Sequence, residues 1–202
     1  MNFLREVAEE GKAILFVGTK KQAQDIIRDY AAKCESSYVN QRWLGGLLTN
    51  FGVVRTSVDK LKELEEMKED GRWDLLSKKE QSKLEKVLRK FQKNLGGLKT
   101  MSARPGAVFV IDSSKETIAI AEARKMHVPI VAVVDTNGDP EDIDYPITGN
   151  DDAVRAIELF ASKAAESIIE GKKNRISKEL QAEKAGETGA AEGEDPETED
   201  AT

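Results

Sequence analysis

Three unbroken apolar runs constrain the fold of this chain more than any other feature of its sequence. They comprise residues 13–17, 107–111 and 129–134. Each run is far too short to cross a membrane as a helix, whereas strands covered on both faces of a sheet have this unbroken apolar character. The runs therefore predict buried strands inside an α/β body.

Helical patterns separate these apolar runs. Their apolar residues recur at three- and four-residue spacing, with Thr19 as a candidate N-cap and Gly11 as the end of the first helix. An alternation of strands and helices predicts a parallel sheet with helices on both sides. The predicted helices are residues 3–10, 20–33, 115–126 and 151–171, with a further short strand at residues 37–39.

A different pattern occupies the middle of the chain. Two helices are predicted at residues 53–70 and 78–95, each with a narrow apolar stripe, and residues 70–74 form the turn between them. This arrangement predicts an antiparallel coiled-coil hairpin that projects from the body. The expected divisions are an α/β body of residues 1–52 and 100–171, a hairpin of residues 53–99, and a final segment of residues 172–202 with a basic knot and a disordered acidic tail.

The net charge of −6 conceals an uneven distribution of charged residues. Residues 183–202 contain eight acidic side chains and one lysine, so the rest of the chain is nearly neutral. The second predicted arm, residues 78–99, has eight basic and two acidic side chains, whereas residues 55–74 have five basic and seven acidic ones. The basic arm suits a phosphate backbone. The alternative is a solvated face that the acidic first arm partly neutralises.

Residues 39–51 are too irregular and too rich in special side chains for a plain linker. Arg42 can bridge two phosphate oxygens, and Trp43 and Phe51 offer aromatic faces to an unpaired base. The paired glycines at positions 45 and 46 allow the backbone to approach a partner closely. The alternative is that Trp43 and Phe51 fill the joint between the body and the hairpin.

The turn Gly18-Thr19-Lys20-Lys21 joins a predicted strand to a predicted helix. Backbone N–H groups at a helix start suit a phosphate, which could belong to a nucleotide or to RNA. The turn lacks a second glycine at P-loop spacing, so a plain turn with solvated lysines fits it equally well.

Four aspartates crowd the loop after the third apolar run, at positions 135, 139, 142 and 144. An enzyme could hold a divalent cation with such a cluster, but the spacing is not that of an EF-hand. Aspartate and asparagine are common in turns and at N-caps, so we expect these structural roles here and predict no metal site.

No set of catalytic side chains is recognisable. His127 and Cys34 are the only histidine and cysteine, and no nucleophile has an evident base beside it. A single cysteine excludes an internal disulfide and suits a reducing cytoplasm, and we expect it in the core. We therefore predict neither an enzyme nor a cofactor.

Several motifs along the chain resemble those of a known family. The most specific are Arg-Trp-Leu-Gly-Gly at residues 42–46 and Gly-Asn-Asp-Asp-Ala at residues 149–153. In order along the chain, to about residue 170, the sequence resembles the family of the second ribosomal protein of the bacterial small subunit. The matching stretches are residues 16–20, 40–50, 95–98, 108–112, 134–140 and 149–153.

The resemblance implies a three-layer α/β/α body with a parallel, flavodoxin-like sheet and an inserted coiled-coil hairpin. It also implies a structural role on the cytoplasmic ribosome: binding to small-subunit ribosomal RNA near the head–body junction, and a part in docking other small-subunit proteins, including the large multi-repeat first protein. No membrane partner is expected.

The expected RNA contacts come from two sources. By position, the resemblance assigns Arg42, Trp43, Thr49, Asn50 and Arg104 to the joint between body and hairpin. Charge and position along the chain add Lys20, Lys21, Arg55, Lys86, Arg89, Lys90 and Lys93.

The start of the chain departs from the family pattern. Family members usually begin some tens of residues earlier, with a histidine-containing turn and an extra strand. Met1 falls where the middle of a helix is expected. The resemblance therefore implies a shortened start, with missing RNA contacts and an uncovered sheet edge.

Two other hypotheses about function stay open at this point. The first is a nucleotide-binding enzyme or switch that uses Gly18, Thr19, Lys20, Asp112 and Asp135. The second is an adaptor whose hairpin grips a protein partner.

Overall fold

A sheet of five parallel strands forms the centre of the protein. The computed structural model describes the backbone of residues 1–190 and the side chains of residues 1–181. The strand order is β2-β1-β3-β4-β5, which is the flavodoxin-like order expected from the sequence. The strands are β1 (Ile14–Val17), β2 (Ser37–Val39), β3 (Ala107–Ile111), β4 (Ile130–Val134) and β5 (Tyr145–Thr148).

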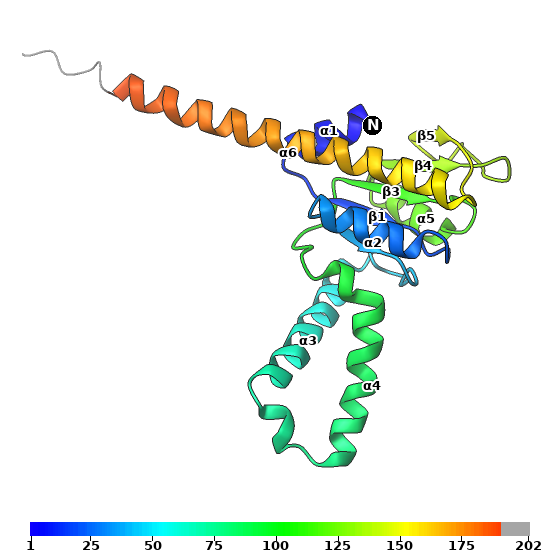
Figure 1. The fold of residues 1–202 in the computed structure, drawn as a ribbon, viewed down its shortest axis with the longest axis vertical. Coiled ribbons are helices and arrows are strands. Elements are labelled where there is room, and N and C mark those ends of the chain that lie inside the picture. Colours follow the sequence, from blue (N-terminus) through cyan, green and yellow to red (C-terminus); the bar gives the residue numbers. More distant parts are fainter. Residues whose placement is uncertain (191–202) are drawn as a thin grey trace, which may run out of the picture.

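Helices cover both faces of this sheet, as the alternating pattern predicts (Figure 1). Successive strand residues point to opposite faces, so each apolar run supplies two separate cores. Leu15 and Val17 pack toward α5 and the hairpin base, whereas Ile14 and Phe16 pack toward α1, α2 and α6. The helices are α1 (Asn2–Glu9), α2 (Gln24–Lys33), α3 (Phe51–Glu69), α4 (Lys78–Leu95), α5 (Thr117–Lys125) and α6 (Val154–Ala190).

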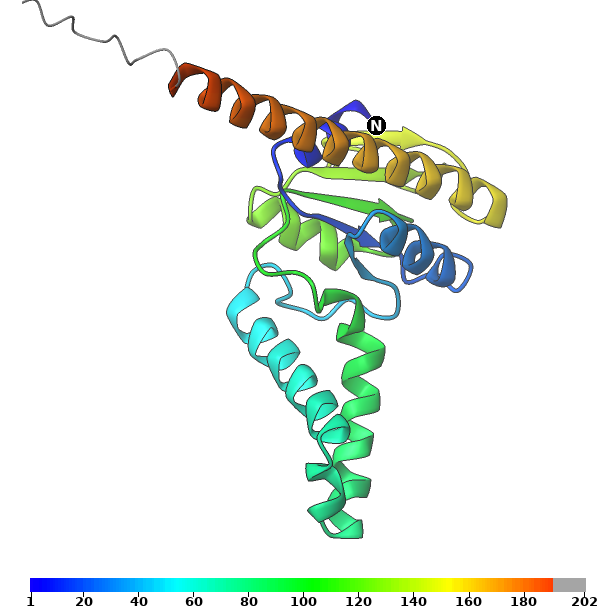
Figure 2. The ribbon, with the colours of Figure 1, turned by 60° about the vertical axis from the view of Figure 1, so that its left-hand side comes forward.

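The hairpin formed by α3 and α4 extends away from the α/β body (Figures 1 and 2). Its arms meet through a narrow set of apolar residues, of which Val58, Leu61 and Leu88 are almost fully buried. A short 3-10 helix (Arg72–Leu75) forms the tip, and a second one (Gly96–Leu98) returns the chain to the body. A helical hairpin at this place confirms the predicted three-layer fold with an insertion; its coiled-coil geometry and the exact domain boundaries stay predictions.

Helix α2 begins later than the sequence pattern predicted. The prediction placed its first turn at residue 20 with Thr19 as the N-cap, but Ala23 holds the N-cap position and no side chain caps the helix. Residues 20–23 form a turn instead, in which the Lys20 carbonyl accepts hydrogen bonds from the N–H groups of Ala23 and Gln24. The Thr19 N–H is directed elsewhere, to a carboxylate of Glu116, 2.9 Å away.

Helix α6 corrects a second prediction. Order was expected to fade at Gly171, yet the helix continues through the basic knot to Ala190. Gly171 lies where α6 crosses α1: an added Cβ there would be 2.3 Å from the Arg5 carbonyl oxygen. The glycine therefore permits close helix packing and does not end the helix. Residues 176–190, which follow the basic knot and were predicted to be disordered, are helical in the structure; residues 191–202 lie outside the described residues, so the disorder of the acidic tail stays a prediction.

Strand β5 was not expected from the sequence. Its residues Tyr145–Thr148 are mostly exposed, so they lack the apolar run that marks the other strands. Pro146 cannot donate a backbone hydrogen bond, which is why proline in a sheet is confined largely to edge strands. The strand lies at the sheet edge beside β4, where this residue is tolerated.

Candidate RNA interface

A single buried carboxylate, that of Glu122 on α5, organises the segment between β2 and the hairpin. Its Oε1 accepts hydrogen bonds from the Trp43 indole N–H at 3.1 Å and the Gly46 N–H at 2.7 Å. Its Oε2 accepts from the Leu48 N–H at 3.0 Å and from the N–H and hydroxyl of Thr49, both at 3.1 Å. Donors from four residues of this loop therefore converge on one side chain.

These hydrogen bonds keep the Glu122 carboxylate charged inside the protein. Burial by itself would raise the pKa of Glu122, but the donors from Trp43 and from the Gly46, Thr49 and Leu48 backbone outweigh it and lower the pKa below 4.5. Glu122 is not among the residues predicted from the sequence. A signal was present, because a lone glutamate stands between Ala119 and Ala123 on the apolar side of its helix.

The loop held by Glu122 turns only some of its predicted RNA contacts outward. Arg42 and Asn50 are exposed, whereas Thr49 is half-buried with its hydroxyl donated to Glu122. Trp43 is 7% exposed and lies in the core cluster, with Phe51 packed partly buried against it. Stacking of a base on Trp43 therefore does not fit this structure; the residue fills the joint between body and hairpin.

The lysines of α4 form the most concentrated exposed charge at the hairpin. Positions 79, 83, 86, 90 and 93 recur at four- and three-residue spacing, so these lysines share one helical face. Leu84, Leu88 and Leu95 mark the other side of the helix, which packs toward α3 and the body. The lysine face is about 21 Å long at a rise of 1.5 Å per residue.

This lysine face has no acidic partners among the side chains that the structure describes. Among the described side chains, two ion pairs link α3 to the rest of the hairpin: Glu65 pairs at 2.6 Å with Lys99, which follows the second 3-10 helix, and Lys68 of α3 pairs with Glu85 of α4 at 2.8 Å. Arg89 also contacts Glu85, at 3.2 Å. The predicted contacts Lys86, Lys90 and Lys93, together with Lys79 and Lys83, are exposed and form no ion pair with any described side chain.

Arg55 and Arg104 lie near the hairpin base but differ in their contacts. The Arg55 guanidinium donates to the Met101 carbonyl at 2.8 Å and lies 3.4 Å from Asp59, so it holds α3 against the chain leaving the hairpin. Arg104 is exposed. The Gly106 N–H donates to the Ala13 carbonyl at 2.7 Å, which places this segment at the amino ends of the strands.

Lys20 lies at the opposite, carboxyl edge of the sheet, apart from Arg104. Its Nζ contacts Asp112 at 3.1 Å and Asp151 at 2.8 Å, and it also pairs with Asp152. Burial by itself would lower the pKa of Lys20, but its hydrogen bonds to Asp151, Asp152 and Asp112 raise that pKa above 10.5. The Lys20 side chain is 15% exposed and its ammonium is bound to protein carboxylates, so it is not available to RNA.

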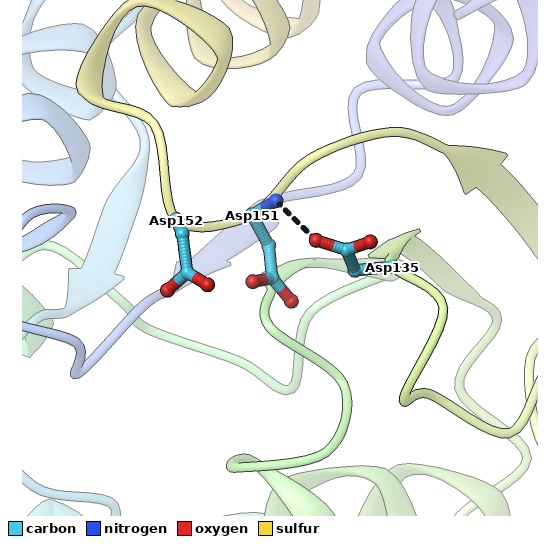
Figure 3. Close-up of side chains that lie close together, drawn as sticks. All are labelled: Asp135, Asp151 and Asp152. Carbon is cyan, nitrogen blue, oxygen red and sulfur yellow. Dashed lines mark hydrogen bonds between the residues drawn. The ribbon is translucent and has the colours of Figure 1, made fainter.

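Figure 3 shows the carboxylates of Asp135, Asp151 and Asp152 side by side. One oxygen from each lies within 4.8 Å of the others, a spacing that would suit a divalent cation, but the Lys20 ammonium already contacts two of them. Asp135 accepts the N–H groups of Thr136 and Asp151, which lower its pKa. Asn150 accepts from the Asp152 and Ala153 N–H groups, so the loop has the turn roles that the sequence predicted.

The turn at residues 18–21 is closed to a nucleotide phosphate. The Thr19 N–H, which a phosphate would need, donates to Glu116. Glu116 is buried, and desolvation raises its pKa in spite of this hydrogen bond. Lys21 of this turn projects into solvent. The turn therefore lacks the free Thr19 N–H and the free Lys20 ammonium on which the hypothesis of a nucleotide-binding enzyme depended.

Comparison with known proteins identifies the family to which this chain belongs. None of the helices described here is long and apolar enough to span a membrane. The model of the family described as ribosomal protein S2 matches residues 1–171. The small ribosomal subunit protein uS2 of Koribacter versatilis (strain Ellin345) is 59% identical over 169 residues, which cover 84% of this chain and 56% of the relative. The chain thus spans little more than half the length of that relative, and it belongs to the ribosomal protein S2 family.

Proposed function

We propose that the chain is a structural constituent of the small ribosomal subunit that binds small-subunit ribosomal RNA through α4 and the adjoining loop of residues 42–50. The observation that carries this proposal is the exposed, unopposed lysine face of α4 on a hairpin that leaves the body. Like charges along one helix repel each other, and phosphates of a polyanion relieve that repulsion. Family membership supports the same role.

The proposed contacts are those predicted residues whose polar groups reach solvent. Lys20, Trp43 and Arg55 act within the protein, and Thr49 contributes mainly by fixing the loop. The remaining predicted contacts are Lys21, Arg42, Asn50, Lys86, Arg89, Lys90, Lys93 and Arg104.

We also propose a place on the cytoplasmic ribosome beside other small-subunit proteins, with no catalytic activity. Docking of the large multi-repeat first protein belongs to this proposal and rests on the family resemblance. Deletion of residues 55–98 tests whether the hairpin binds RNA or a protein. Loss of RNA binding in the deletion variant supports our proposal. Retained RNA binding with loss of a protein partner would show instead that the hairpin is an adaptor.

The RNA proposal is tested by replacing Lys83, Lys86, Lys90 and Lys93 with glutamine. Binding of small-subunit ribosomal RNA is measured between 50 and 200 mM salt, a range over which about 6–10 phosphate contacts change affinity by roughly 10³–10⁵. The variant should bind more weakly, and each phosphate interaction that the substitutions remove should make the salt slope shallower by about 0.7–0.9. Its melting temperature should not fall, because these side chains are exposed.

The matched control replaces four exposed lysines elsewhere, Lys33, Lys115, Lys125 and Lys163, and removes the same total charge. If both quadruple variants lose affinity equally, net charge and not the α4 face governs binding. A wild-type chain whose affinity does not change with salt would exclude phosphate contacts altogether.

A further inference from the structure

A cavity of about 220 Å³ lies at the amino edge of the sheet, away from the loop of residues 42–50. Five separate segments line it: the end of α1, the turn into β1, the turn into β2, the exit of the hairpin and α6. One water needs only about 10–15 Å³ of such volume, so the cavity has room for a phosphate group together with some of its hydration. The lining includes Gly11, Lys12, Ser36, Ser37, Thr100, Lys172 and Arg175.

Three cations and three hydroxyls line this cavity. Lys172 is anchored by donating to the Cys34 carbonyl at 2.7 Å, and its Nζ is 3.4 Å from the Glu35 carboxylate. Ser37 and Thr100 share one hydrogen bond at 3.2 Å, which leaves the second hydroxyl hydrogen of the pair available. Glu35 is the single acidic residue in the lining that the structure describes.

The position of Arg175 is set by a glycine. Gly11 has a φ of +75°, and a Cβ built on it would be 2.0 Å from a guanidinium nitrogen of Arg175. The Arg175 guanidinium therefore lies directly against the Gly11 backbone. Any other residue at position 11 would place its Cβ in the space that the guanidinium occupies. This contact exists because α6 continues past Gly171 into the basic knot.

The ion pairs of these cations are exposed and exchangeable. Lys12 lies 2.7 Å from Glu10, and Arg175 lies 2.6 Å from Glu179 within its own helix. All four side chains are about half exposed, and exposed ion pairs of this kind contribute little to stability because water screens their charges. An arriving phosphate would thus displace weak partners.

We infer that this cavity binds a phosphate group of the RNA backbone, with Lys12, Lys172 and Arg175 as its cations. The inference rests on the proposed function and adds a second contact face to it. A larger neighbouring cavity shares Gly11, Lys12 and Ala13 and is lined by Arg104 as well as by Glu6 and Glu10, so a continuous hollow connects the phosphate site to a predicted RNA contact. The RNA path would follow the amino edge of the sheet from Arg104 to the basic knot of α6.

The test uses the full chain with Lys12→Gln and Arg175→Gln, which leave the anchored Lys172 in place. Binding to small-subunit ribosomal RNA should weaken by about tenfold, as expected when a charged hydrogen-bonding partner is removed. The control, Lys115→Gln with Lys163→Gln, removes the same charge from exposed positions outside the cavity and the basic knot and should bind like wild type.

Two further arms separate the alternative outcomes. Inorganic phosphate should raise the melting temperature of wild type above that in chloride at equal ionic strength, and should not do so for the cavity variant. A phosphate effect with unchanged RNA affinity in the variant would overturn the RNA assignment in favour of a free phosphate. Unchanged RNA affinity in the cavity variant, alongside weakened binding of the α4 variant, would overturn this inference and leave the proposed function standing.

Discussion

The Gly18–Lys21 turn and helix α4 are both lysine-rich, but the fold encloses Lys20 of the turn among carboxylates and leaves the lysines of α4 exposed. Lys20 is enclosed by Asp112, Asp151 and Asp152, which come from two distant parts of the sequence. The lysines at 83, 86, 90 and 93 share a face that no described carboxylate reaches. The difference shows that positive charge indicates a nucleic-acid contact only where the fold leaves it exposed and does not enclose it among buried carboxylates.

Among the tests of this comparison, the substitution of Lys20 is expected to have the largest effect. Lys20→Met leaves the buried carboxylates of Asp112 and Asp151 without their cation, and removal of one partner of a buried pair costs about 3–5 kcal/mol of unfolding free energy. Urea denaturation measures this loss, and RNA affinity of the folded variant should match wild type. The double variant Lys20→Met with Asp151→Asn should recover part of the stability. A stable Lys20→Met protein that binds RNA poorly would place Lys20 at the interface after all.

Substitution of Glu122 is expected to have an intermediate effect. It sharpens the comparison because this buried carboxylate accepts hydrogen bonds from the loop of residues 42–50 and has no lysine partner. Glu122→Gln places an NH₂ group against N–H donors and should cost about 2–3 kcal/mol at neutral pH. Because the folded pKa of Glu122 is lowered, its contribution is present above pH 4.5 and is lost as the pH falls through the folded pKa. The stability difference between wild type and variant should therefore shrink below pH 4.5 in acid-dependent urea titrations. A difference that stays constant across this acid range would contradict the charged network.

The smallest effect is expected where the chain that leaves the hairpin pairs with α3. Lys99→Gln removes the contact with Glu65, a partly exposed pair worth up to about 1 kcal/mol. Burial would raise the pKa of Glu65, but Lys99 and Gln92 lower it, so the loss should appear above pH 4.5 and vanish in acid. Thermal unfolding of the variant at neutral and acid pH measures it. A loss as large as that at Lys20 would show that the arms depend on this pair rather than on their apolar contacts.

Much of the fold could be predicted because it depends on local pattern. The apolar runs identified β1, β3 and β4, and the spacing of Val54, Val58 and Leu61 identified α3. Strand β5 escaped prediction because an exposed edge strand needs no apolar run. The prediction at Gly171 failed because a glycine in a helix can permit a close crossing as well as end the helix, and the crossing partner Arg5 lies far away in the sequence.

The candidate interface was predictable only in part. The basic excess of α4 follows from counting residues, since an amphipathic helix exposes its polar side wherever it packs. The contacts of Trp43 and Arg55 could not be predicted from the sequence. Each depends on a partner that is distant in the sequence, Glu122 for Trp43 and Met101 for Arg55. The cavity beside the basic knot was invisible for the same reason.

The sequence by itself determined most of the strands and helices and where the excess positive charge of the hairpin lies, because these follow from the period and composition of neighbouring residues. Only the tertiary structure decided which polar groups form hydrogen bonds and ion pairs within the protein and which remain free to contact a partner. Hydrogen bonds and ion pairs act over a few ångströms in space, so the carboxylates that bind Lys20 and Trp43 could be identified only after folding had placed them.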